Sequence, residues 1–288
     1  MHKGMMKLLL RRQKNNLARR RRQVKRTPIF ERLEDRRLMA AAPELFSDIN
    51  TGTLHSNPYG FTELAGEVYF FATNEASAND YSPQPEPLPL PVLDPQPQDW
   101  FPGFGPVLDI DLWKTDGTAA GTVRVKDLPP SREYPDQLTK AGAALYFAAF
   151  DEATGKELWT SDGTTVGTSL LADIMPGERS SDLWNITAVG DRIFFVAADN
   201  AHGREIWTSD GTAAGTTNVS DFAFGPVSFK VSATRAYFIA DDGVHGSELW
   251  SSDGTQAGTA VVKDLRPGAA GGGIVLLPAV GSTMYFRS

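Results

Sequence analysis

The sequence predicts an all-β fold, a β-propeller-like array of four-stranded blades with about four full units and partial units at both ends. Three observations support this prediction: one motif recurs at a nearly fixed spacing, each repeat contains four short strand-like segments, and the main segments are apolar on both faces. A period of about 40–50 residues is typical of repeat architectures such as propellers. A residue that occupies one register four times is expected to be structural, because a catalytic site is normally needed once.

Each full unit contains one reference tryptophan, and successive tryptophans are separated by 46, 48 and 43 residues. The tryptophans of units one to four are Trp113, Trp159, Trp207 and Trp250. An acid lies two positions before each of them: Asp111, Glu157, Glu205 and Glu248. Three positions after each tryptophan begins Asp-Gly-Thr, at Asp116, Asp162, Asp210 and Asp253. Gly-Thr follows at Gly121, Gly167, Gly215 and Gly258, and a further acid at Asp127, Asp173, Asp221 and Asp264.

Unit two shows the strand pattern of a blade. Strands are predicted over 137–142, 144–150, 157–161 and 169–174, separated by Gly-rich or polar turns. Neighbouring residues in "LYFAA" and "LW" are both large and apolar, so both faces of the sheet must be covered. A parallel β-helix has shorter repeats, and a β-sandwich would not keep one tryptophan register four times. Blades that pack face to face around an axis meet these requirements.

The stretch "DGTxxGT" is predicted to be a turn that joins the third strand of a unit to the fourth. Asp-Gly between apolar segments favours a turn, because Gly adopts positive φ and the Asp carboxylate accepts backbone N–H bonds. The threonine hydroxyls can add similar bonds, and the tryptophan beside the turn can fill the gap between neighbouring blades. The motif is therefore expected to be structural.

Two segments depart from the repeat. Residues 76–106 hold nearly half of the prolines and are predicted to be an exposed insertion within unit one. The segment 45–49 matches the closing strand of a unit, and 277–288 matches the first two strands of another. Together they would form a blade without its tryptophan strand, so the sequence is expected to be a fragment of a longer repeat protein.

The first 42 residues are predicted to be a separate, disordered or loosely helical basic arm, followed by the repeat domain over 43–288. Residues 1–40 carry a net charge of +11 and the remainder −18, so nucleic acid is not expected as a partner of the repeat domain. No apolar run is long enough to span a membrane. The stretch "FERLEDRRLMAA" resembles the LEPR-XLL-type motif of large exported bacterial proteins, with Asp35 where that family has proline. This resemblance implies an export or sorting role.

The repeat resembles a bacterial family of exported proteins with tandem ELWxxDGTxxGT repeats, sometimes labelled hyalin-like. The resemblance covers residues 45–288 and rests on the tryptophan and Asp-Gly-Thr columns together with the preceding aromatic pairs Tyr146-Phe147, Phe194-Phe195 and Tyr237-Phe238. It implies a secreted or cell-surface protein of the bacterial envelope, without an assigned reaction. The expected partner is an unknown extracellular protein or glycan.

No catalytic, cofactor-binding or metal-ligating residue is assigned from the sequence, and no cofactor is expected. Calcium stays an open alternative, because the acidic columns, with Asp151, Asp199 and Asp242, place hard oxygen ligands on loops. The sequence has no cysteine. His202 and His245 occur near the start of the tryptophan strands but form no chelating pair with another histidine, so they are expected to be turn residues.

The sequence therefore predicts a non-catalytic, structural or binding module. The alternative is a glycan-processing, sialidase-like propeller hydrolase. These two functions differ in one sequence feature: an enzyme needs charged residues that occur once and converge on one face. Such residues are found mainly in the insertion and in the loops "PPSREYP" (129–135) and "MPGERSSD" (175–182), which are predicted to form the binding face.

Overall fold

The structure is a computed structural model that describes residue 49 and residues 56–73, 107–268 and 271–288. The predicted basic arm, the Pro-rich insertion and nearly all of the segment 45–49 lie outside the described residues. Strands are the only regular elements within the described ranges, as predicted. Among these residues no helix is long and apolar enough to cross a membrane.

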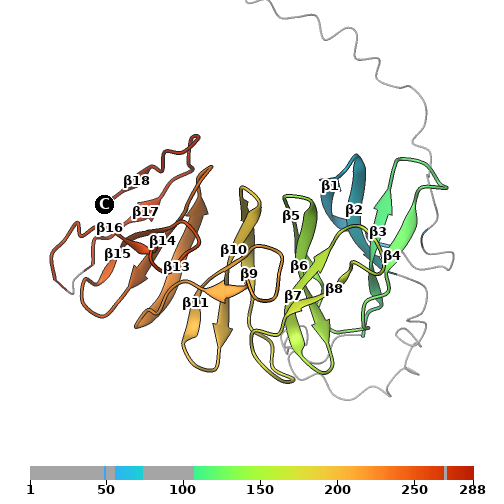
Figure 1. Cartoon of the computed structure of the whole chain (residues 1–288), viewed down its shortest axis with the longest axis horizontal. Coiled ribbons are helices and arrows are strands. Elements are labelled where there is room, and N and C mark those ends of the chain that lie inside the picture. Colours follow the sequence, from blue (N-terminus) through green and yellow to red (C-terminus); the bar gives the residue numbers. More distant parts are fainter. Residues whose placement is uncertain (1–48, 50–55, 74–106, 269–270) are drawn as a thin grey trace, which may run out of the picture. The chain divides into compact units, whose positions relative to one another are not determined.

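Four antiparallel sheets follow one another along the chain, each with its strands in sequence order (Figure 1). The first contains β1 (Tyr59–Leu64), β2 (Glu67–Thr73), β3 (Ile110–Thr115) and β4 (Val123–Lys126). The second contains β5 (Asp136–Ala141), β6 (Ala144–Asp151), β7 (Gly155–Ser161) and β8 (Ser169–Ala172). The third contains β9 (Trp184–Val189), β10 (Arg192–Asp199), β11 (Gly203–Ser209) and β12 (Thr217–Asn218). The fourth contains β13 (Phe224–Val231), β14 (Ala236–Asp241), β15 (Ser247–Ser252) and β16 (Ala260–Lys263).

The sheets pack face to face in sequence order, and an apolar core lies between each pair. Phe147 of β6 packs edge-on against Phe71 of the first sheet, with ring centroids 5.5 Å apart. Its neighbours Tyr146 and Ala148 belong to the core between the second and third sheets. Because successive side chains of a strand point to opposite faces, one strand fills two cores. This arrangement confirms the prediction of propeller-like blades that are apolar on both faces.

The Asp-Gly-Thr segments form the predicted turns, with the same hydrogen bonds in all four units. In unit two, Asp162 Oδ1 accepts the backbone N–H of Thr164 at 2.9 Å and its hydroxyl at 2.7 Å. Thr164 Oγ1 accepts the N–H of Gly167 at 3.0 Å, and the hydroxyl of Thr168 donates to the Thr164 carbonyl at 2.6 Å. These bonds to the carboxylate lower the pKa of Asp162. The repeated aspartates are therefore turn caps.

In units two to four the glycine of the turn also permits contact with the preceding sheet. Gly163 has φ +89°, and a Cβ there would overlap the hydroxyl of Tyr69 from the first sheet. Gly211 has φ +90°, and its Cβ would lie 2.6 Å from the hydroxyl of Tyr146. Gly117 of unit one has φ +88° and no atom within 4 Å of its Cβ position. The turn glycine thus serves both backbone geometry and packing between sheets.

Replacing Gly163 by alanine is expected to lower the free energy of unfolding by about 3 kcal/mol, whereas Gly117→Ala costs about 1 kcal/mol. Both variants place an L-residue in the left-handed region, which costs about 1–2 kcal/mol, but only the Gly163 variant must also displace Tyr69. Urea unfolding of the two variants measures the difference. Equal losses would contradict the packing role of this glycine.

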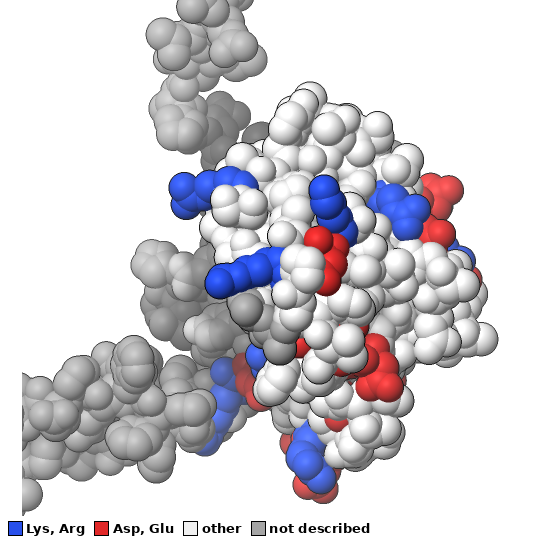
Figure 2. All heavy atoms as spheres, turned by 90° about the vertical axis from the view of Figure 1, so that its left-hand side faces the viewer, with Lys and Arg blue, Asp and Glu red and all other residues white. Residues whose placement is uncertain are grey.

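A two-stranded sheet of β17 (Val275–Leu276) and β18 (Phe286–Arg287) follows the fourth sheet and contributes Leu276 to a core with Ile239. Only the second strand of this hairpin falls within the partial unit predicted over 277–288, because β17 ends at Leu276. Its aromatic pair is 51% exposed at Tyr285 and 38% exposed at Phe286. Figure 2 shows the molecule from this side, where uncharged surface is interrupted by a few Lys, Arg, Asp and Glu side chains.

Candidate functional site

The acids two positions before each tryptophan are buried and tie the third strand of a sheet to the loop after its fourth strand. Each carboxylate accepts the backbone N–H of a residue 17 positions later. The four pairs are Asp111 with Leu128, Glu157 with Ile174, Glu205 with Phe222, and Glu248 with Leu265. Desolvation raises the pKa of Asp111, Glu157 and Glu205, in the case of Glu157 to about 7. This column is part of the scaffold.

The raised pKa of Glu157 predicts a pH-dependent stability. Because its folded pKa of about 7 lies above the ordinary value of 4.5, its contribution is fully present below about pH 4.5. The contribution is lost as the pH rises through about 7. Glu157→Gln does not titrate, so the wild type is expected to lose stability relative to this variant between pH 5 and pH 8.

Urea unfolding at both pH values measures this change, with Glu152→Gln in the exposed β6–β7 turn as the control. Parallel stability profiles of the wild type and Glu157→Gln would show that Glu157 does not titrate in this range.

A polar surface pocket of about 360 Å³ lies where the second and third sheets meet their entry loops. We call it the loop pocket; it is lined by Glu133, Lys156, Ser180, Asp182, Leu183 and Arg204. Glu133 comes from the loop before β5, and the residues at 180–183 come from the loop before β9. These are the two loops predicted to form a binding face. The structure brings side chains of both into one pocket.

Opposite charges face each other in the loop pocket. Arg204 Nη2 lies 3.6 Å from Asp182 Oδ2, and the Asp182 side chain is 69% exposed. Lys156 Nζ lies 3.3 Å from Asp136, and the Lys156 backbone N–H donates to Ser180 Oγ at 2.9 Å. Asp182 has φ +48°, and a non-glycine residue in this region is uncommon and often found at functional sites.

The basic residues of the loop pocket distinguish the middle of the chain from its ends. The position three before the tryptophan is basic only in units two and three, as Lys156 and Arg204. Unit one has Ile110 there and unit four has Ser247. The loop pocket therefore combines single-copy carboxylates with cations that the other units lack. Such a lining can donate and accept several hydrogen bonds.

The histidines lie in turns, as predicted. His202 Nδ1 is 2.8 Å from Asp199 Oδ2, and His245 Nδ1 is 2.7 Å from Asp242 Oδ2. Each backbone N–H also donates to the same aspartate. The hydrogen bond to its aspartate raises the pKa of each imidazole. These acids thus cap the turn between the second and third strands.

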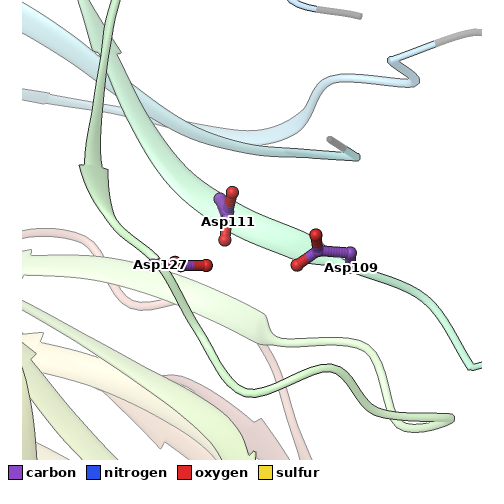
Figure 3. A group of neighbouring side chains, drawn as sticks. All are labelled: Asp109, Asp111 and Asp127. Atoms are coloured by element: carbon purple, nitrogen blue, oxygen red, sulfur yellow. The ribbon is translucent and has the colours of Figure 1, made fainter. Parts of the chain in front are cut away.

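Three carboxylates of unit one come together around β3 and the end of β4 (Figure 3). One oxygen each of Asp109, Asp111 and Asp127 lies within 4.8 Å of the others. Desolvation by burial and the charge of Asp127 raise the pKa of Asp109. Asp111 and Asp127 belong to the acidic columns recognised in the sequence, whereas Asp109 was not predicted as part of a site. Asp109 could have been noticed because it lies four positions before the tryptophan, where the other units have glycine: Gly155, Gly203 and Gly246.

No protein-family model matches the chain, and no curated protein matches it. Solved structures with a similar fold include an acylaminoacyl peptidase from Pyrococcus horikoshii, with 10% identity over 72% of this chain and 32% of that one (TM-score 0.41). A puromycin-hydrolysing peptidase from Mycobacterium tuberculosis has 12% identity over 76% and 34% (TM-score 0.40). An α-L-arabinofuranosidase from Clostridium thermocellum has 12% identity over 70% of both chains (TM-score 0.29). The chain thus spans about a third of each peptidase.

These structures correct one prediction made from the sequence. A non-catalytic structural or binding module was expected, whereas similar solved structures include peptidases and a glycosidase. At these identities and TM-scores the similarity concerns the fold, so no substrate or residue role is transferred from them. Any activity must be argued from the residues of this chain.

Proposed function

We propose that this chain is an exported, glycan-processing hydrolase whose reaction takes place in the loop pocket. The observation that carries the proposal is the convergence of two single-copy carboxylates, Glu133 and Asp182, with Lys156 and Arg204 in one polar pocket. The turn aspartates and the buried acids before the tryptophans hold the scaffold together. Glu133 and Asp182 lie outside these repeated columns. Export is supported by the sequence of the N-terminal arm.

Glycoside hydrolysis needs the kind of residues that the loop pocket contains. Most glycosidases use two carboxyl groups, one that protonates the leaving oxygen and one that acts as a base or nucleophile. Glu133 and Asp182 would supply these groups, while Lys156, Arg204 and Ser180 donate hydrogen bonds to sugar hydroxyls or to a sugar carboxylate. The Arg204 guanidinium, 3.6 Å from Asp182, would orient that carboxylate as the base or nucleophile.

The test is an assay of the purified full chain on a panel of polysaccharides and 4-nitrophenyl glycosides, including a sialoside, with release of reducing ends or nitrophenol as the measurement. The proposal expects release from at least one carbohydrate substrate. Asp182→Arg, which would fill the loop pocket and remove a carboxylate, should abolish it. Release that persists in Asp182→Arg, or no release from any substrate on the panel, would contradict the proposal.

A further inference from the structure

We propose that Asp109, Asp111 and Asp127 form a calcium-binding site in unit one, separate from the loop pocket. The three side chains come from the start of β3 and from the residue after β4, and their oxygens face one another (Figure 3). Opposite oxygens around one Ca²⁺ ion are about 4.6–5.2 Å apart, twice the usual Ca–O distance. The three oxygens lie within 4.8 Å of one another, so all of them can reach one ion.

The second observation is an unpartnered oxygen inside the group. Asp109 is 6% exposed, and its Oδ1 atom is buried without a hydrogen-bond partner. Buried carboxylate oxygens normally have a partner, because leaving one unpaired is unfavourable. Asp111 is different, since its Oδ1 accepts the N–H of Leu128 at 3.0 Å. A cation between the three carboxylates would supply the missing partner of Asp109.

The charges of the group also favour a divalent ion. Arg124 is the cation that contacts it: Nη1 lies 3.0 Å from Asp111 Oδ2 and 3.4 Å from Asp127 Oδ1. One guanidinium beside three carboxylates leaves two negative charges when all three are ionised. The Arg124 side chain is 39% exposed, so it can swing away when an ion enters. Carboxylate oxygens without histidine or cysteine suit Ca²⁺ better than Zn²⁺.

The repeat itself indicates that unit one adds a further feature to the common scaffold at this group. Unit one differs from the others at three of the four positions concerned. Asp109 replaces a glycine, Asp111 replaces a longer glutamate, and Arg124 stands where the other units have Leu170, Asn218 and Val261. Only Asp127 belongs to a column that all units share. Differences confined to one cluster are expected for a site needed once.

The test is calorimetric titration of the full chain with CaCl₂, using Asp127→Asn and Asp109→Asn as variants. The wild type is expected to bind one Ca²⁺ with a dissociation constant of about 10⁻⁴–10⁻³ M, typical of extracellular sites, and both variants should bind at least about tenfold more weakly. Asp127 is 69% exposed, so its variant leaves the fold intact even if Asp109→Asn does not.

The matched control is Asp173→Asn, which removes the exposed acid of the same column in unit two, where Gly155 replaces Asp109. It should bind calcium as the wild type does. Arg124→Leu should bind several-fold more tightly, because the competing cation is gone. Absence of calcium binding by the wild type, unchanged binding by Asp127→Asn, or weaker binding by Arg124→Leu would overturn the proposal.

Discussion

Replacing Glu133 by glutamine is expected to lower kcat/KM for a carbohydrate substrate by about 100-fold or more. Proton transfer by a positioned carboxyl group typically contributes about 10²–10⁴-fold to an enzymatic rate, and glutamine cannot transfer the proton. Glu133 is exposed at the rim of the loop pocket. Its replacement should therefore change the free energy of unfolding by less than about 0.5 kcal/mol.

The matched control for this variant is Glu178→Gln. Glu178 is an exposed acid in the neighbouring loop 175–182 but does not line the loop pocket. It should retain full activity. A Glu133→Gln protein with wild-type kcat/KM would remove Glu133 from the catalytic role, and an equal loss in both variants would point to a general effect of surface charge.

Replacing Phe195 by alanine is expected to have the largest effect on stability, a loss of about 3–5 kcal/mol in the free energy of unfolding. Phe195 is fully buried in the core between the second and third sheets, where its ring stacks on Trp207 with centroids 6.4 Å apart. Hydrogen bonds also join these two sheets, as from the Ile186 N–H to Gln137 Oε1 at 2.9 Å. The buried apolar core between the sheets is nevertheless expected to supply most of the free energy that holds the blades together.

Thermal and urea unfolding measure this loss, with Phe224→Ala as the control. Phe224 is 68% exposed, so its removal should cost less than about 1 kcal/mol. Similar losses in both variants would mean that the cores between sheets do not dominate stability. If the third and fourth sheets of Phe195→Ala unfold in a separate transition, the cores between sheets are also what makes the blades unfold together.

The fold could be predicted from the sequence because its determinants are local and repeated. The tryptophan register places each third strand, and the continuous apolar run around Phe147 shows that both faces are covered. Asp162 and Thr164 define the turn through bonds to residues only two or three positions away. The predicted strand 169–174 was too long, since β8 ends at Ala172 and the backbone N–H of Ile174 donates to Glu157 instead.

The sites could be predicted only in part, because they depend on how neighbouring sheets and loops approach each other. The loops 129–135 and 175–182 were singled out by composition, but the approach of Arg204 to Asp182 depends on the packing of one sheet on the next. Asp109 was missed because its position carries glycine elsewhere and lies outside the repeated acidic columns. Its burial beside Asp111 follows from the start of β3, which sequence patterns locate poorly.

Catalysis in the loop pocket is tested most directly by a crystal structure of the Asp182→Asn variant soaked with the oligosaccharide that the wild type cleaves best. We expect the sugar in the loop pocket, with its scissile bond between Glu133 and residue 182 and with hydroxyl or carboxylate groups on Lys156 and Arg204. A sugar bound at any other surface, with the loop pocket holding only water, would contradict it.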